Sequence, residues 1–65
     1  MDTLLDFTGK TALITGAASG FGKSLSQALA QRGANLVLAD FNAEGLSLTQ
    51  TECETLGAKV VGLVG

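Results

Sequence analysis

Three glycines and one aspartate have the residue types and the spacing to hold a nucleotide. Gly16, Gly20 and Gly22 lie within the segment TGAASGFG, residues 15–22, and Asp40 follows Gly20 by 20 residues. The start of a helix offers unpaired backbone N–H groups and a partial positive charge, so a pyrophosphate can bind there without a lysine. A carboxylate about 20 residues further along can accept hydrogen bonds from both hydroxyls of a ribose.

Each glycine has its own role in this interpretation. Gly16 turns the chain sharply off the preceding strand, Gly20 lets the backbone approach the ligand, and Gly22 lets the helix pack closely on the sheet. Simpler interpretations exist for the polar residues nearby. Asp40 can be a solvated strand end or a helix cap, and Ser19 can cap the helix that follows it.

Three apolar runs predict the strands that would position these residues. They cover residues 11–15, 35–39 and 59–64, and Asp40 comes directly after the second of them. Their apolar residues are consecutive rather than alternating, a pattern typical of parallel strands that are buried on both faces.

Two helices are predicted between the strands. The first runs from Gly20 to Gly33, and its apolar stripe consists of Phe21, Leu25, Ala28 and Leu29. The second has Asn42 as its N-cap and ends at Gly57. One of its faces contains Leu46, Thr49, Cys53 and Leu56.

The order βαβαβ predicts an α/β fold, namely the Rossmann-like half of a doubly wound parallel sheet. Right-handed crossovers place both helices on the same face of that sheet. The opposite face and the free edge of the first strand therefore stay uncovered. We expect these surfaces to favour self-association or pairing with further polypeptide.

Composition and charge exclude several classes of protein. The net charge is −2, and the few basic residues are scattered along the chain: Lys10, Lys23, Arg32 and Lys59. This charge and this distribution argue against a nucleic-acid partner. The absence of histidine excludes a His-based metal site, and we predict no metal. The single cysteine, Cys53, excludes an intrachain disulfide and is expected to be a small core residue.

The expected location is the cytoplasm, with no membrane partner. A lone cysteine fits a reducing compartment. Residues 1–7 lack the basic start of a secretory signal, and no apolar run approaches the ~18 residues that a membrane helix needs.

The spacing T-G-x-x-x-G-x-G, the elements around it and Asp40 closely resemble the N-terminal part of short-chain dehydrogenases/reductases. The resemblance runs from about Phe7 to Gly65. It implies that residues 1–65 are the incomplete N-terminal portion of a single NAD(P)-binding Rossmann domain. It also implies an oxidoreductase that acts on an alcohol or ketone and forms a homo-oligomer.

The resemblance also assigns roles to the site residues. The cofactor loop consists of Gly16, Ser19, Gly20 and Gly22. Phe21, where the family more often has Ile or Leu, contributes its backbone N–H near the phosphates. Asp40 holds the adenosine ribose and Phe41 lies beside the adenine.

The same resemblance predicts NAD rather than NADP as the cofactor. A 2′-phosphate would meet the carboxylate of Asp40, and Ser19 is neutral where NADP-preferring relatives often carry Arg or Lys. The family's catalytic Ser, Tyr and Lys, with a Y-x-x-x-K arrangement, have no counterpart here, because the sequence contains no tyrosine. We therefore predict no catalytic residue in this chain and no turnover by it alone.

Two alternatives remain. The first is a non-enzymatic fragment that binds nucleotides or associates with itself. The second is a P-loop nucleotide-binding protein, suggested by the Gly-Lys-Ser at residues 22–24, with Lys23 as the phosphate lysine. That motif needs a glycine where this chain has Ala17, so it is disfavoured.

Overall fold

The computed structural model describes residues 7–65, so the segment 1–6 used above for the location lies outside it. Five elements occur in the predicted order, and they are β1 (Thr11–Thr15), α1 (Gly20–Gln31), β2 (Asn35–Asp40), α2 (Ala43–Thr55) and β3 (Val60–Val64). The strands form one parallel sheet in the order β1-β2-β3. The predicted βαβαβ fold is confirmed.

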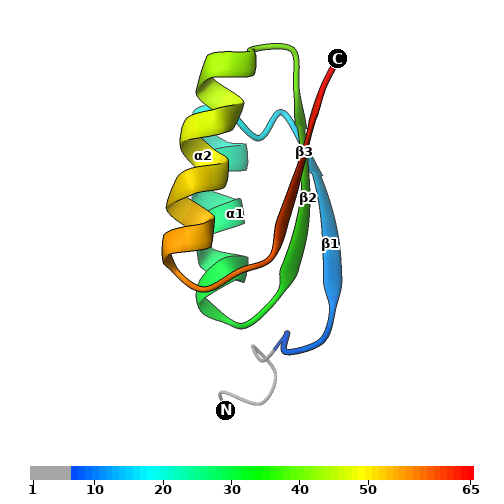
Figure 1. Ribbon diagram of the computed structural model, residues 1–65, viewed down its shortest axis with the longest axis vertical. Coiled ribbons are helices and arrows are strands. Elements are labelled where there is room, and N and C mark those ends of the chain that lie inside the picture. The colour runs from blue at the N-terminus through cyan, green and yellow to red at the C-terminus, as the bar shows by residue number, and fades with distance from the viewer. Residues whose placement is uncertain (1–6) are drawn as a thin grey trace.

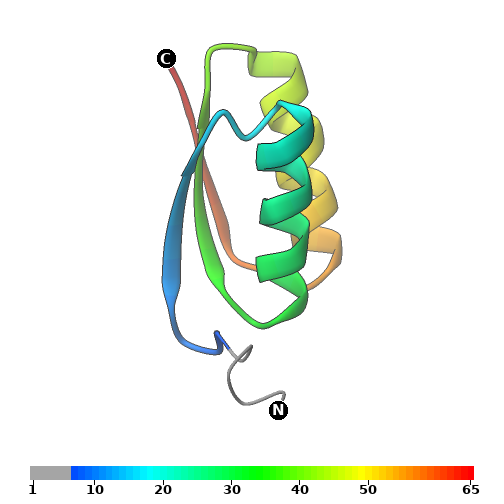
Figure 2. The same ribbon diagram turned by 180° about the vertical axis from the view of Figure 1, so that it is seen from behind.

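The molecule has two layers, one of strands and one of helices. Both helices cover the same face of the sheet, as the two opposite views show (Figures 1 and 2). The core lies between the layers, and its buried apolar residues are Ile14, Ala17, Ala30, Ala34, Leu36, Leu38, Leu46 and Cys53. The prediction that one sheet face has no helix over it is confirmed for the described residues.

The uncovered face of the sheet is apolar. Leu13 of β1 is in register with Val37 of β2, which is in register with Val61 of β3. Because side chains alternate between faces, these three share the face opposite the helices. Leu13 is 68% exposed and Val61 is 56% exposed, whereas the neighbouring Ile14 on the helix side is 6% exposed.

The predicted apolar stripe of α1 is wrong for most of its residues. Phe21 is 81% exposed and Leu25 is also exposed, while Leu29 is half-buried. The buried face instead consists of Gly22, Ser26 and Ala30. These small residues recur every four positions and let the helix lie close to the rest of the molecule, so the larger apolar side chains turn outward.

The face and caps of α2 largely follow the prediction. Leu46, Thr49 and Cys53 are buried. Asn42 caps the helix, because its side-chain oxygen accepts from the Gly45 amide at 3.0 Å. Leu56, the C-cap residue, is exposed and does not join the buried face, contrary to the prediction. No helix in residues 7–65 is long and apolar enough to cross a membrane.

Candidate functional site

The predicted site residues gather at the carboxyl end of the sheet. The β1–α1 loop (residues 16–19) and the turn from β2 into α2 lie at the same end of the molecule as the C terminus (Figure 1). A hollow of about 290 Å³ opens there, lined by Thr15, Gly16, Ala39, Asp40, Phe41 and Gly65. Ligands of open parallel sheets bind outside the carboxyl ends of the strands.

Two of the three glycines are required by the fold itself. Gly16 has φ +67°, in the left-handed region that favours glycine. A Cβ atom on Gly22 would collide with the carbonyl oxygen of Gly16 and lie 2.8 Å from its carbonyl carbon. The close approach of α1 at Gly22 is therefore an approach to the backbone of the turn at Gly16, so each glycine depends on the other.

Gly20 differs from the other two. It is the first residue of α1, its φ is not positive, and a Cβ atom there would have no neighbour within 4 Å. Neither backbone strain nor packing within residues 7–65 explains a glycine at this position. The space beside Gly20 is open for a ligand to approach the backbone.

Ser19 occupies the N-cap position of α1, but its side chain does not cap the helix. Its Oγ donates instead to the carbonyl oxygen of Gly16 at 2.6 Å. Within the described residues, the amides of Gly20, Phe21 and Gly22 therefore have no hydrogen-bond acceptor. Such amides, together with the helix dipole, attract an anion.

The carboxylate of Asp40 is bound to the backbone on both sides. Its Oδ1 accepts from the amide of Asn42 at 2.8 Å, and its Oδ2 accepts from the amide of Ala18 at 3.0 Å. The Asn42 hydrogen bond, and after it the one from Ala18, stabilises the charged form and lowers the pKa of Asp40 below its ordinary value. Asp40 is partly exposed and does not cap α2, since Asn42 does.

The β1–α1 loop has further tethers that the sequence analysis missed. The amide of Ala17 donates to the carbonyl oxygen of Ala39 at 3.1 Å, and the buried Thr49 donates its hydroxyl proton toward the carbonyl oxygen of Ala17 at 3.1 Å. No spacing motif connects residues 17 and 49. Only the burial of a polar Thr49 on an otherwise apolar helix face could have suggested a partner for it.

The two predicted aromatic residues lie at the surface. Phe41 lines the hollow next to Asp40 and is 88% exposed, and Phe21 projects from the first turn of α1. Phe41 therefore lies at the hollow, and the backbone amide of Phe21 is one of the open amides at the start of α1. The roles that the resemblance implies for both residues stay predictions.

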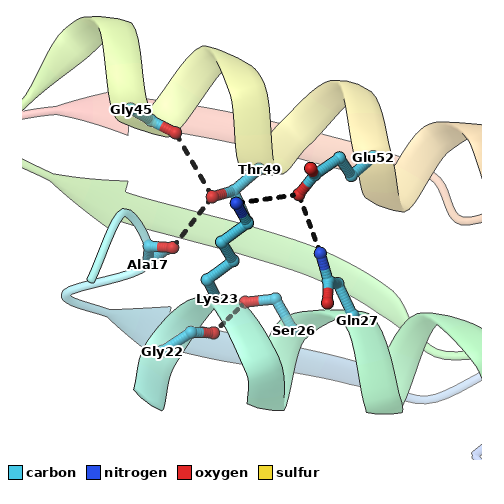
Figure 3. A network of polar contacts seen from close by, with 8 residues as sticks. All are labelled: Ala17, Gly22, Lys23, Ser26, Gln27, Gly45, Thr49 and Glu52. Atoms are coloured by element: carbon cyan, nitrogen blue, oxygen red, sulfur yellow. Dashed lines mark hydrogen bonds and ion pairs between the residues drawn. The ribbon is translucent and has the colours of Figure 1, made fainter. Parts of the chain in front are cut away.

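Lys23 lies in a polar contact between the two helices. Its Nζ is 3.6 Å from Glu52, which also accepts a hydrogen bond from Gln27 at 2.7 Å (Figure 3). The P-loop alternative needs this ammonium group on a phosphate, but here it faces a carboxylate of α2. No cluster of three or more metal-ligating residues occurs within residues 7–65.

Cys53 is fully buried in the core. Burial, and after it the neighbouring charges of Glu52 and Glu54, raises the pKa of its thiol. A raised pKa keeps the sulfur protonated and poorly nucleophilic. The prediction that Cys53 is a core residue is confirmed.

Comparison with known proteins identifies relatives that share this segment. Residues 10–65 match the family described as short chain dehydrogenase. The cyclohexanol dehydrogenase of Acinetobacter sp. (strain SE19) is 47% identical over 53 residues, which are 82% of this chain and 21% of that protein. The chain spans about a fifth of the length of the curated relatives it matches.

Solved structures agree with this assignment. A short-chain type dehydrogenase/reductase from Mycobacterium marinum superposes with a TM-score of 0.88 at 35% identity, over 95% of this chain and 25% of its own. One from Burkholderia phymatum, in complex with NAD, gives a TM-score of 0.84 at 42% identity, over 91% of this chain and 21% of its own. The chain belongs to the short-chain dehydrogenase/reductase family.

Proposed function

We propose that this chain binds the adenosine and pyrophosphate end of NAD as the N-terminal segment of an oxidoreductase. The open amides of Gly20, Phe21 and Gly22 carry this proposal. They lie at the start of α1, and Gly16 of the preceding loop lines the hollow that also contains Asp40. A pyrophosphate would accept from these amides, and the relative from Burkholderia phymatum binds NAD.

We propose NAD rather than NADP because of the charge at the ribose position. The lowered pKa of Asp40 keeps its carboxylate ionised at neutral pH. Each carboxylate oxygen accepts one backbone hydrogen bond and has a second acceptor site, so two ribose hydroxyls can bind in addition. A 2′-phosphate would instead face a like charge, with only the neutral Ser19 nearby in the loop.

The whole protein is proposed to oxidise an alcohol or reduce a ketone. When bound, the cofactor would accept the hydride as NAD in the oxidation or donate it as NADH in the reduction, and the residues of this chain would bind and orient its adenosine end. Hydride transfer also needs a group that exchanges a proton with the substrate oxygen. The sequence has neither tyrosine nor histidine, so we assign it no catalytic residue. The lone buried cysteine fits the proposed cytoplasmic location.

Calorimetric titration of the chain with NAD, NADP and magnesium ATP tests this function. We expect NAD to bind, although weakly, and to bind more tightly than either competitor. Tighter binding of magnesium ATP would favour the P-loop alternative. Absence of binding by all three would refute nucleotide binding by this chain.

Self-association is a second proposed property, and the exposed apolar sheet face supports it. Leu13, Val61 and Leu63 are each more than half exposed on this face. Such a surface favours pairing with a second copy or with further polypeptide. Sedimentation should show mass increasing with concentration, and Leu13→Glu should reduce it. Leu48→Glu, at a 60% exposed position on α2, is the matched control. A sharp monomer at all concentrations would contradict the proposal.

A further inference from the structure

The peptide group between Ala17 and Ala18 is held at both its ends. Its carbonyl oxygen lies 3.1 Å from Oγ1 of Thr49, and its N–H donates to Oδ2 of Asp40 at 3.0 Å. The C=O and N–H of a trans peptide point in opposite directions. Thr49 and Asp40 therefore fix the plane of this peptide from opposite sides, one from α2 and the other from the end of β2.

We propose that Thr49 is a positioning residue of the dinucleotide site, which acts through this peptide on Asp40 and on the start of α1. The inference rests on the proposed function. Thr49 is 1% exposed, and its Oγ1 also lies 3.2 Å from the carbonyl oxygen of Gly45, the preceding turn of its own helix (Figure 3). Helical threonines commonly bond to that local carbonyl. The contact with Ala17 is made in addition to this local bond, and it connects α2 to the β1–α1 loop.

The loop needs such a tether because of the residue before it. Gly16 has φ +67°, and glycine adopts positive and negative φ with similar ease. Rotation at Gly16 would turn the Ala17–Ala18 peptide and withdraw its N–H from Asp40. Ala17 is fully buried, so a carbonyl that loses Thr49 also loses its partner in the core. The Thr49 hydroxyl thus maintains both the loop conformation and the position of the carboxylate.

Three variants separate this role from ordinary packing. Thr49→Val removes the hydroxyl and keeps the branched shape, whereas Thr49→Ser keeps the hydroxyl. Thr55→Val is the matched control, because the Thr55 hydroxyl bonds to the Thr51 carbonyl at 2.9 Å in the same helix and has no contact with the loop. We expect Thr49→Val to weaken NAD binding about 3- to 10-fold, the effect of one hydrogen bond, and the other two variants to stay within about twofold.

Amide hydrogen exchange, measured without ligand, tests the contact between Thr49 and Ala17 independently. In the wild-type chain, the amide of Ala18 should exchange its hydrogen more slowly than the open amide of Gly20. Thr49→Val should speed exchange at Ala18 about 3- to 10-fold and leave Leu38 in the middle of β2 unchanged. Thr49→Ser should restore the wild-type rate.

Each outcome decides either the positioning role of Thr49 or the proposed binding of NAD. Equal exchange at Ala18 in wild type and Thr49→Val overturns the positioning role, as does NAD binding that Thr49→Val leaves unchanged. If Thr49→Val does not fold, Thr49→Ala, which also removes the hydroxyl, takes its place in both measurements. Fast exchange at Ala18 in the wild type, equal to that at Gly20, would also overturn the role. A wild type that does not bind NAD refutes the proposed function, while Ala18 exchange still decides whether Thr49 holds the loop.

Discussion

Replacement of Gly20 by alanine should separate the stability of this chain from its nucleotide binding. A Cβ atom at Gly20 enters open space, and the backbone there is helical. Exchange of glycine for alanine at such a position reduces the freedom of the unfolded chain and stabilises a protein by about 0.4 to 1 kcal/mol. Gly20→Ala should therefore fold at least as stably as wild type.

The same methyl group should impair NAD binding. It would project where the proposed pyrophosphate approaches the amides at the start of α1. Loss of one hydrogen bond to a charged group costs about 1.5 to 3 kcal/mol, which corresponds to roughly 10- to 150-fold in affinity. Gly22→Ala is the contrasting variant, because its Cβ atom would collide with the Gly16 carbonyl. It should lose about 1 to 3 kcal/mol of folding stability.

Denaturant unfolding and NAD titration of both variants form the assay. Gly20→Ala should keep or raise its unfolding midpoint and lose affinity for NAD, whereas Gly22→Ala should lose stability. If Gly20→Ala binds NAD as tightly as wild type, the ligand does not approach the backbone at Gly20. If it unfolds as easily as Gly22→Ala, the space beside Gly20 is not open.

Three further predictions concern Asp40 and the reaction. Asp40→Ala should weaken the binding of NAD more than that of NADP, since it removes ribose hydrogen bonds from NAD and a like-charge repulsion from NADP. An unchanged preference for NAD in competition binding would show that Asp40 does not set the preference. Folding lowers the pKa of Asp40 below 3.8, so the stability it contributes is fully present above pH 3.8 and is lost as the pH falls through the lowered value. An Ala18 amide resonance that does not move in that acidic range would contradict this. The 65-residue chain should show no change in NADH absorbance with alcohols or ketones, and sustained turnover would disprove our assignment of catalysis to other residues.

The strands and helices were predictable because their signals are local. The runs at residues 11–15 and 35–39 are strands, and the second extends by one residue to include Asp40. Gly33 and Gly57 end the helices with positive φ, as expected of glycine at these positions. Asn42 caps α2 through a hydrogen bond three residues ahead, a contact that depends on neighbouring sequence alone.

The buried face of α1 was not predictable from hydrophobicity. The sequence offers larger apolar residues on one side, among them Phe21 and Leu25, and small residues on another. The close approach of Gly22 to the Gly16 carbonyl selects the small side, because any Cβ atom at Gly22 would collide there. Ser26 can be buried on that side because its hydroxyl donates to the Gly22 carbonyl at 2.6 Å. Steric fit therefore outweighs apolar area in setting the rotation of α1.

The tethers of the β1–α1 loop explain why a glycine-rich segment can hold a defined shape. Glycine makes the turn at Gly16 possible but gives it no preference for a single conformation. That preference comes from Ala39, Asp40 and Thr49, which bond to the loop backbone from β2 and α2. A loop fixed before the ligand arrives loses less conformational entropy on binding. The carboxylate proposed to select the ribose thus also holds the loop proposed to bind the phosphates, so replacing Asp40 should affect both ends of the adenosine pyrophosphate together.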